Sequence, residues 1–278
     1  MARRQAHKRG AAYAPRLVIM AKSPVLGLAK RRLGREIGAT PAIRFYRTCL
    51  AHTVLRLASD PRWQTLLAVT PDKDVAQHFW RSPGTSRVPQ SDGDLGKRMQ
   101  RLFNRLPPGP TIIVGSDIPS LSALRVAEAF GLLGRADAVL GPAPDGGYWL
   151  IGLKRVPKIL APFTSVRWSG PHTLADTVAN LKRRRIAYAA TLHDVDTAEA
   201  YRTERANAER LIPLRLCGEG ACARLLRLGL LLLLQPRHDL DEGARAVAIV
   251  QLILKDAIPG ILAGAGRSRH AENVSAFG

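Results

Sequence analysis

A short apolar run that ends in a carboxylate constrains this fold more than any other stretch. Residues 111–119 read Thr-Ile-Ile-Val-Gly-Ser-Asp-Ile-Pro. Three consecutive β-branched residues, 112–114, predict a strand that is buried on both faces, as in a parallel sheet. Gly115 and Pro119 end the run. We therefore expect Asp117 at the carboxyl end of a central strand, where open α/β sheets bind their ligands.

Similar apolar runs recur along the chain and alternate with segments of helical periodicity. The expected strands cover residues 17–21, 66–70, 86–89, 111–114, 138–142, 148–153 and 188–192, with residues 78–80 as part of the third element. The expected helices cover residues 29–37, 41–58, 96–106, 121–133 and 171–185. This alternation predicts an α/β fold with three layers and a mostly parallel, Rossmann-like sheet.

Composition divides the chain of 278 residues into three parts. Residues 1–15 are expected to form a flexible basic arm, and residues 16–210 the α/β domain. Residues 211–278 are rich in Leu, Arg, Ala and Gly and predict a helical or partly disordered extension, with helices at 225–234 and 244–254. Packing of this extension on a second subunit would make a homo-oligomer. The leucine run at 228–234 is too short to span a membrane, so no membrane span is expected.

Charge and cysteine content narrow the class of protein. The chain has 42 Lys and Arg against 22 Asp and Glu, a formal net charge of +20, which favours anionic partners. It lacks the aromatic and basic strand of RNA-binding domains and any zinc-finger spacing, so a dedicated nucleic-acid binder is disfavoured. Three cysteines are too few for a disulfide framework, which predicts a reduced, cytoplasmic protein without a signal peptide.

Acidic residues are scarce, and three groups of them follow predicted strands. These groups are Asp117, Asp145 and the pair Asp194 and Asp196. Carboxylates two positions apart on an extended segment lie on one side of it. Carboxylates that converge repel one another unless a cation lies between them, and Mg²⁺ prefers such oxygen ligands. The alternative for Asp194 and Asp196 is capping of a helix that begins near residue 197.

A basic loop follows the first predicted strand and opens a helix. Residues 22–33 read Lys-Ser-Pro-Val-Leu-Gly-Leu-Ala-Lys-Arg-Arg-Leu. Backbone N–H groups at the helix start, together with Lys22, Lys30 and Arg32, predict a polyphosphate site on a loop shaped by Gly27. The loop lacks the Gly-Lys-Ser/Thr ending of a P-loop and is not a GxGxxG motif. The alternative is a solvated basic helix face.

A second polar loop precedes the helix expected at residues 96–106. Residues 90–99 read Gln-Ser-Asp-Gly-Asp-Leu-Gly-Lys-Arg-Met. The glycines and aspartates of this loop, which include Asp94 and Gly96, predict that it is mobile and closes over a nucleotide base. Arg98 would then reach a phosphate. An ordinary capped turn explains the same spacing.

Paired glycines mark a third loop, Asp145-Gly146-Gly147-Tyr148. Glycines permit positive φ and let the backbone approach a ligand closely, so Gly146 and Gly147 are candidate nucleotide contacts. Asp145 beside them could orient or deprotonate an acceptor group. The alternative is a hairpin turn of the Asp-Gly type.

Taken in order, these motifs resemble a GT-A-fold glycosyltransferase-like family. This is the group of radical-SAM/selenodomain-associated transferases linked to arsenosugar biosynthesis, which is similar to the guanylyltransferases of molybdenum cofactor and 2-phospholactate metabolism. The matching pieces are Lys22-x-Pro24-x-x-Gly27-x-x-Lys30-x-Arg32-Leu33, Gly93-Asp94-Leu95-Gly96-x-Arg98-Met99, Gly115-Ser116-Asp117-x-Pro119, Pro142-x-x-Asp145-Gly146-Gly147-Tyr148 and Asp194-x-Asp196-Thr197. They extend over residues 16–205.

The resemblance implies a nucleotide bound over the N-terminal half of the sheet. Asp117 would be the metal-binding aspartate, and Asp194 and Asp196 would complete a site for Mg²⁺ or Mn²⁺. Lys30 and Arg32 would contact phosphates. Asp117 and Asp145 are the expected catalytic residues, and the other expected nucleotide or phosphate contacts are Lys22, Gly27, Asp94, Gly96, Arg98, Gly146 and Gly147. Arg31 stands where the family usually has Thr.

Three functions remain open from the sequence. The favoured one is a metal-dependent glycosyltransferase that takes a nucleotide sugar and a small-molecule acceptor. The second is a nucleotidyltransferase that takes an NTP and releases pyrophosphate. Both reactions would use a metal ion to neutralise charge on the phosphates. The third is a non-catalytic nucleotide- or RNA-binding module, which the net charge would favour and whose binding would depend strongly on salt.

Overall fold

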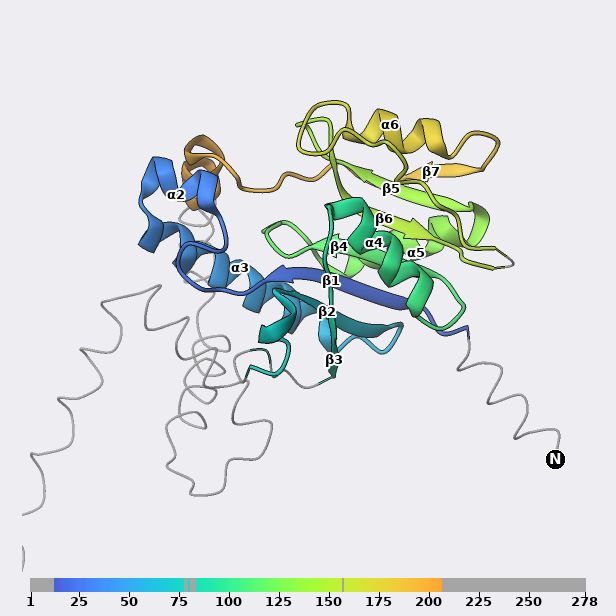
Figure 1. The fold of residues 1–278 in the computed structure, drawn as a ribbon, viewed down its shortest axis with the longest axis horizontal. Coiled ribbons are helices and arrows are strands. Elements are labelled where there is room, and N and C mark those ends of the chain that lie inside the picture. Colours follow the sequence, from blue (N-terminus) through green and yellow to red (C-terminus); the bar gives the residue numbers. More distant parts are fainter. Residues whose placement is uncertain (1–12, 78–79, 81–83, 157, 207–278) are drawn as a thin grey trace, which may run out of the picture. The chain divides into compact units, whose positions relative to one another are not determined.

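The computed structural model describes residues 13–77, 80, 84–156 and 158–206. Within them a seven-stranded sheet has the order β3-β2-β1-β4-β6-β5-β7 (Figure 1). The strands are β1 (Arg16–Lys22), β2 (Gln64–Thr70), β3 (Thr85–Pro89), β4 (Thr111–Gly115), β5 (Ala138–Pro142), β6 (Tyr148–Leu153) and β7 (Ile186–Tyr188). β6 runs antiparallel to β4 and β5, and the other neighbouring strands pair in parallel. The predicted mostly parallel α/β sheet is therefore confirmed.

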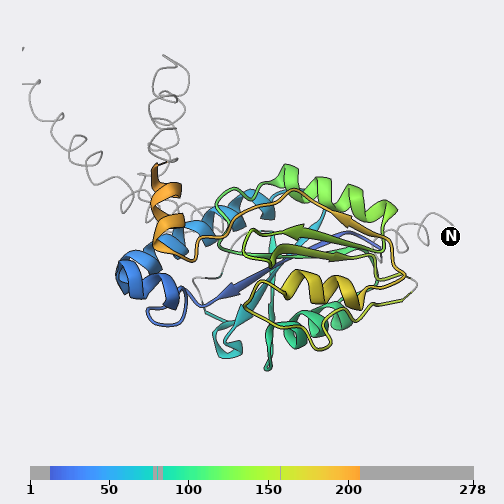
Figure 2. The same ribbon diagram turned by 90° about the horizontal axis from the view of Figure 1, so that it is seen from above.

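Helices cover both faces of this sheet and make the three layers that the sequence predicts. They are α2 (Arg31–Ile37), α3 (Ala39–Ala58), α4 (Leu95–Arg105), α5 (Ala123–Arg135) and α6 (Thr173–Asn180), with a 3₁₀ turn, η1 (Asp72–Asp74), and a further helix at residues 198–206. Figure 2 shows α3 and α5 on one face, and α4 and α6 on the other.

Alternating side chains of the central strands build a core on each face. In β1, Leu17 and Ile19 pack in the cluster under α3 and α5, whereas Val18 packs in the cluster under α4 and α6. All three are fully buried. The continuous apolar run of a strand buried on both faces is thus explained, because successive side chains point to opposite sides of the sheet.

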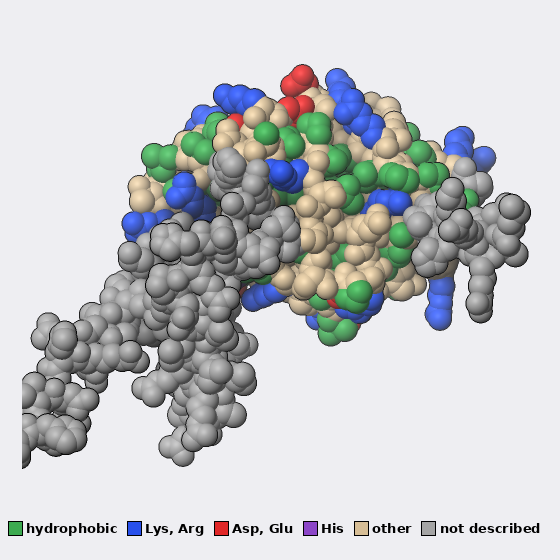
Figure 3. All heavy atoms as spheres, turned by 90° about the horizontal axis from the view of Figure 1, so that it is seen from below, with side chains coloured by type: hydrophobic (Ala, Val, Ile, Leu, Met, Phe, Trp, Pro, Cys, Tyr) green, Lys and Arg blue, Asp and Glu red, His purple; other side chains and the backbone are tan. Residues whose placement is uncertain are grey.

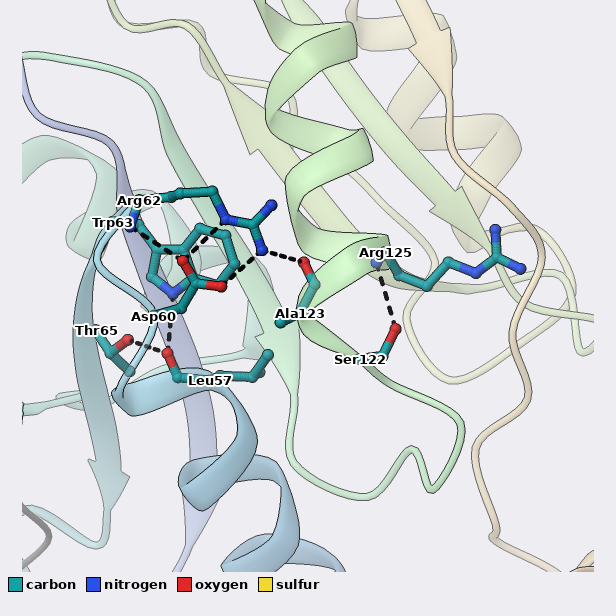
Figure 4. Close-up of polar contacts among 8 residues, drawn as sticks. All are labelled: Leu57, Asp60, Arg62, Trp63, Thr65, Ser122, Ala123 and Arg125. Carbon is teal, nitrogen blue, oxygen red and sulfur yellow. Dashed lines mark hydrogen bonds and ion pairs between the residues drawn. The ribbon is translucent and has the colours of Figure 1, made fainter.

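The connection from α3 to β2 is held by side-chain hydrogen bonds (Figure 4). The carbonyl oxygen of Leu57 near the end of α3 accepts hydrogen bonds from the Trp63 indole and the Thr65 hydroxyl, both at 3.0 Å. The Arg62 guanidinium stacks over the Trp63 ring and donates to the carbonyl of Ala123 at 3.4 Å. These contacts tie the ends of α3, β2 and α5 together.

Two predicted boundaries near the end of the sheet are wrong. The strand expected at residues 188–192 is Ile186–Tyr188, because β5 pairs with it only over Ala138–Leu140, and β5 ends two residues later at Pro142. Proline has no N–H with which to continue a ladder. The helix expected at 171–185 ends at Asn180, and Arg183 then adopts a left-handed φ of 66°.

After β7 the chain crosses the carboxyl edge of the sheet towards α2. Val195 from this crossing segment, residues 189–197, packs with Leu33 of α2 and Ala42 of α3 in a small apolar cluster. The carboxylate of Glu36 accepts a hydrogen bond from the backbone N–H of Ala198 at 2.8 Å. Segments far apart in the sequence are thereby joined at this edge, where the helix at 198–206 lies near α2 in Figures 1 and 2.

Other predictions fall outside the described residues. They concern most of the basic arm at 1–15, residues 78 and 79 of the third element, and the extension at 211–278 with its two expected helices. Among the described helices, none combines the length and apolar character needed to cross a membrane.

Two glycines in different surroundings give a test of this packing. A Cβ at Gly141 in β5 would lie 2.5 Å from the Trp149 indole, whose N–H is bound to the Ala190 carbonyl, so Gly141→Ala should lower the free energy of unfolding by about 1–3 kcal/mol. A Cβ at Gly131 in α5 would meet open space, so Gly131→Ala should raise that free energy by about 0.5–1 kcal/mol. Urea denaturation measures both, and effects of the same sign would contradict the packing described.

Candidate active site

A buried lysine between two carboxylates forms the centre of the candidate site. Asp117 directly follows β4, Lys30 precedes α2, and Asp196 lies on the crossing segment. The Lys30 Nζ is 2.6 Å from Asp117 Oδ2 and 2.5 Å from Asp196 Oδ1. Only 3% of the Lys30 side chain is exposed, against 29% for Asp117 and 42% for Asp196. The carboxylates therefore form the solvent-facing side of the cluster.

The backbone at Lys30 is unusual for a lysine. Its φ of 51° and ψ of 40° lie in the left-handed region, at the N-cap position of α2. A residue with a Cβ is uncommon there and adopts the conformation only when its surroundings hold it in place. The two short ion pairs supply that hold, so the side chain of Lys30 is fixed by its partners rather than by backbone preference.

Charge and burial act strongly on this cluster. Burial disfavours a charged Lys30, but the negative charges of Asp117 and Asp196 and their hydrogen bonds outweigh it and raise its pKa. Burial, together with the charges of Asp196 and Asp117, raises the pKa of Asp194 to about 6. The charge of Asp145 adds to this shift. The structure thus brings the three predicted acidic groups into one electrostatic environment.

The end of β1 is held in place by Tyr46 of α3, which is 3% exposed. The Tyr46 hydroxyl accepts a hydrogen bond from the Lys22 backbone N–H at 2.8 Å and lies 3.1 Å from both the Lys22 carbonyl and the Ser116 hydroxyl. Burial raises the pKa of Tyr46 to about 12, so the phenol stays neutral. This one side chain links the start of the basic loop to the residue beside Asp117.

Gln90 plays a corresponding part at the neighbouring strand ends. Its buried side-chain amide donates to the carbonyls of Ala21 and Ala68, at 3.0 and 2.8 Å, and so bridges β1 and β2. Its Oε1 accepts a hydrogen bond from the Arg98 guanidinium at 3.3 Å. Arg98, predicted as a phosphate contact, is thereby directed from the first turn of α4 to the carboxyl edge.

The predicted basic residues are not all brought together. Lys22 and Arg32 are exposed, and within the described part of the chain no side-chain ion pair joins either of them to the cluster. Gly27 lies on an exposed turn with a φ of 82°. A Cβ at this position would meet no atom within 4 Å, so no close contact requires the glycine. Of the predicted phosphate-binding cations, Lys30 alone contacts the acids in these described residues.

Asp94 and Gly96 have clear structural tasks. Asp94 is the N-cap of α4, where its side chain accepts a hydrogen bond from the Lys97 backbone N–H at 2.8 Å. A Cβ at Gly96 would lie 2.5 Å from the Trp168 ring and 2.9 Å from the Phe163 Cβ. The capped turn that the sequence left open is therefore present, and nucleotide contacts by Asp94 and Gly96 stay predictions.

The loop at Asp145 is a turn that packs on the start of α6. Asp145 Oδ1 accepts a hydrogen bond from the Gly147 N–H at 2.9 Å. Gly146 has a φ of 84°, and a Cβ there would collide with the backbone of Pro171. Its carbonyl accepts a hydrogen bond from Leu174 at 2.9 Å. Packing alone thus requires Gly146, and the ligand contacts predicted for Gly146 and Gly147 stay predictions, as does the catalytic role of Asp145.

The acids suit a divalent metal in their chemistry but not in their present arrangement. Carboxylate oxygens are the ligands that Mg²⁺ and Mn²⁺ prefer. Yet among the described residues no three His, Cys, Asp or Glu side chains are placed to hold a metal ion. The ammonium of Lys30 lies instead between two of the three expected ligands, Asp117 and Asp196.

Sequence reasoning missed Tyr46 and Gln90. Tyr46 shares the helical spacing of the core residues Ile43 and Leu50, so nothing in the pattern separates it from packing. Gln90 follows β3, which reads Thr-Ser-Arg-Val-Pro, so the sequence around it gives no sign that its side chain is buried. Their shared task is to position backbone and charge around the site.

Comparison with known proteins agrees with this fold. A family described as "Uncharacterized protein conserved in bacteria (DUF2064)" matches residues 53–170. A crystal structure of a candidate nucleotide-diphospho-sugar transferase from Desulfovibrio desulfuricans G20 is 27% identical, with a TM-score of 0.63 over 78% of this chain and 95% of that chain. None of the curated proteins compared with the chain matches it.

Two further solved structures are more distant. Rv0371c from Mycobacterium tuberculosis H37Rv is 16% identical, with a TM-score of 0.46 over 69% of this chain and 98% of that one. The 4-diphosphocytidyl-2C-methyl-D-erythritol synthase from Anaerococcus prevotii DSM 20548 is 10% identical, with a TM-score of 0.47 over 71% of this chain and 99% of that one. The match to the Desulfovibrio structure alone confirms the GT-A-like, Rossmann-like α/β fold.

Among the described residues that Figure 3 leaves uncovered, the Lys and Arg side chains do not form one continuous track. Lys and Arg side chains are dispersed there among apolar and neutral ones. A groove that follows a nucleic-acid backbone would gather them instead. This face therefore offers no support for the binding-module alternative.

The N-cap role of Asp94 can be separated from a ligand role by stability. Asp94→Ala should lower the free energy of unfolding by about 1 kcal/mol, because the Lys97 N–H loses its acceptor, and Asp94→Ser should restore most of it. The exposed neighbour Asp92 gives the control, since Asp92→Ala should change stability by less than about 0.5 kcal/mol. Equal stability of all three variants in urea denaturation would show that the cap contributes nothing.

Proposed function

We propose that this chain is a nucleotide-dependent transferase whose site is the Lys30–Asp117–Asp196 cluster. The observation that carries the proposal is the placement of opposite charges at the carboxyl ends of parallel strands, where α/β sheets bind ligands. A polyphosphate needs cations around it, and a metal that accompanies it needs carboxylates. The likeness to a candidate nucleotide-diphospho-sugar transferase, at 27% identity and over nearly the whole of that chain, supports this assignment.

Glycosyl transfer is the reaction that we favour. The donor would be a nucleotide sugar, and a small-molecule acceptor would attack the sugar carbon as a nucleoside diphosphate leaves. The description of the Desulfovibrio protein as a candidate nucleotide-diphospho-sugar transferase supports this choice. The motif resemblance to glycosyltransferase-like proteins points the same way.

The chain's own residues would divide the work of binding and orientation. Lys30 and Arg98 would contact donor phosphates, with Arg98 directed by Gln90. Asp145, exposed and close enough to raise the pKa of Asp194, would lie beside the acceptor and orient its hydroxyl. Lys22 and Arg32 are exposed and free to turn towards an incoming phosphate in the described structure.

Asp117, Asp194 and Asp196 would hold a divalent metal, Mg²⁺ or Mn²⁺. When bound, such an ion would neutralise charge on the leaving nucleoside diphosphate. The oxygen donors fit this ion. Burial raises the pKa of Asp194 most, and the like charges of Asp196 and Asp117, which a cation would neutralise, raise it further. The type of metal is left to experiment.

Nucleoside diphosphate release from a panel of nucleotide sugars and NTPs, each with Mg²⁺ or Mn²⁺, tests the proposal. Asp117→Asn removes a charge at the cluster and should lower kcat/KM by about 100-fold or more, because the ion pair and the metal ligand are both lost. Glu128→Gln, the corresponding loss of a carboxylate on an exposed side chain of α5, should leave kcat/KM within about twofold. Circular dichroism checks that both variants are folded.

The products decide between the alternatives. Pyrophosphate released from an NTP would replace glycosyl transfer by nucleotidyl transfer. Absence of turnover with every donor, together with metal-independent and strongly salt-dependent nucleotide binding, would favour the binding module. Full activity of Asp117→Asn would show that the cluster is not the active site.

A further inference from the structure

We propose that Lys30 is an internal cation that excludes free divalent metal from the Asp117–Asp196 pair until the phosphates of a nucleotide draw it away. The inference rests on the proposed function, because it assumes that a nucleotide binds here. It assigns Lys30 two alternating sets of partners: the carboxylates in the free protein and the phosphates in the complex. Metal and nucleotide would then enter the site together rather than independently.

Distance carries the first step. The Lys30 Nζ is within 2.6 Å of an oxygen of Asp117 and 2.5 Å of an oxygen of Asp196. A bound Mg²⁺ requires carboxylate oxygens at about 2.1 Å, in the space that the ammonium fills. Ammonium and metal also carry charges of the same sign, so the two cations compete for one position.

Burial carries the second step. With 3% of its side chain exposed, Lys30 cannot exchange its partners for water where it stands, and loss of one carboxylate would leave a buried charge without compensation. Asp117 and Asp196 are more exposed than Lys30 and form the solvent-facing side of the cluster. A ligand that releases Lys30 must therefore bring negative charge of its own to that side, which a di- or triphosphate does and a metal ion alone does not.

Backbone geometry carries the third step. Lys30 is held in the left-handed region after a turn that is anchored at its start, where Ser23 binds Thr70 and Asp74. Residues 25–28 of the same turn are exposed, and within the described part of the chain their backbone hydrogen bonds run only to Ser23 and Val25. The exposed Gly27 of this turn has a positive φ and no close neighbour for a Cβ. A change at Lys30 would thus fall on the exposed residues 25–28 and leave the anchored start of the turn, next to β1, in place.

Mn²⁺ binding without nucleotide, followed by electron paramagnetic resonance of the free ion, tests the exclusion. Wild type should show no saturable site below millimolar Mn²⁺, whereas Lys30→Met should bind Mn²⁺ about 10-fold more tightly or better, because the carboxylates lose their cation. Lys30→Arg should behave as wild type. Arg35→Met removes the same charge from the exposed side of α2 and should change Mn²⁺ affinity by less than about threefold.

The same titration with UDP, GDP, CDP and ADP tests the release. At least one nucleotide should raise the Mn²⁺ affinity of wild type about 10-fold, and the gain should be smaller in Lys30→Met, where no cation has to be displaced. Equal Mn²⁺ affinity of wild type and Lys30→Met would overturn the exclusion. Failure of every nucleotide to raise the affinity of wild type would overturn the release.

A measurement on wild type covers the case in which Lys30→Met does not fold. A buried, ion-paired lysine ammonium gives a separate ¹⁵N signal, assigned by its loss in Lys30→Arg. Mg²⁺ alone should leave this signal unchanged, and Mg²⁺ with the nucleotide should shift it; a shift with Mg²⁺ alone would contradict the proposal. These readouts need no turnover, so a protein that transfers nothing can still confirm the role of Lys30, and an active transferase can still refute it.

Discussion

The ammonium of Lys30 joins three pieces of chain at one point through its two ion pairs. Asp117 comes from the end of β4, Lys30 from the start of α2, and Asp196 from the segment that crosses back after β7. A buried lysine is costly unless both its charge and its hydrogen bonds are satisfied. At this edge of the sheet both carboxylates therefore lie against one buried cation, which needs the two of them together.

The scaffold below this cluster explains why the arrangement can be rigid. β1 and β4 are neighbours in the centre of the sheet, with both faces covered, so the backbone that carries Lys22 and Asp117 rests on fully buried strands. Tyr46 and Gln90 then bind the strand ends from above through backbone atoms. The backbone groups of Lys22, Ala21 and Ala68 at these strand ends thus have hydrogen-bond partners of their own. They do not compete for the charged side chains, which are available to a ligand.

Much of this could be read from the sequence. The run before Asp117 indicated a central strand because three apolar β-branched residues in succession are typical of a strand buried on both faces. The pairing of Lys30 with Asp117 and Asp196 could not be read, because it depends on how α2 and the crossing segment meet in space. Asp194 and Asp196 were expected directly at a strand end, but β7 stops at Tyr188, which pairs with Leu140 at the last position of the ladder between β5 and β7. The sequence also left the reason for the glycines open. A Cβ at Gly96 would collide with Trp168 and one at Gly146 with Pro171, so packing requires both glycines with or without a ligand.

The crossing segment has a consequence for the order in which the site is completed. All seven strands of the sheet lie before residue 189, yet Asp196, one of the two carboxylates paired with Lys30, comes after them. During synthesis, a nascent chain can hold every strand of its sheet and still lack half of the partners that Lys30 needs. The crossing segment is thus the last part of the site to be synthesised. The charge of Lys30 is paired with both carboxylates only after this segment has packed against α2.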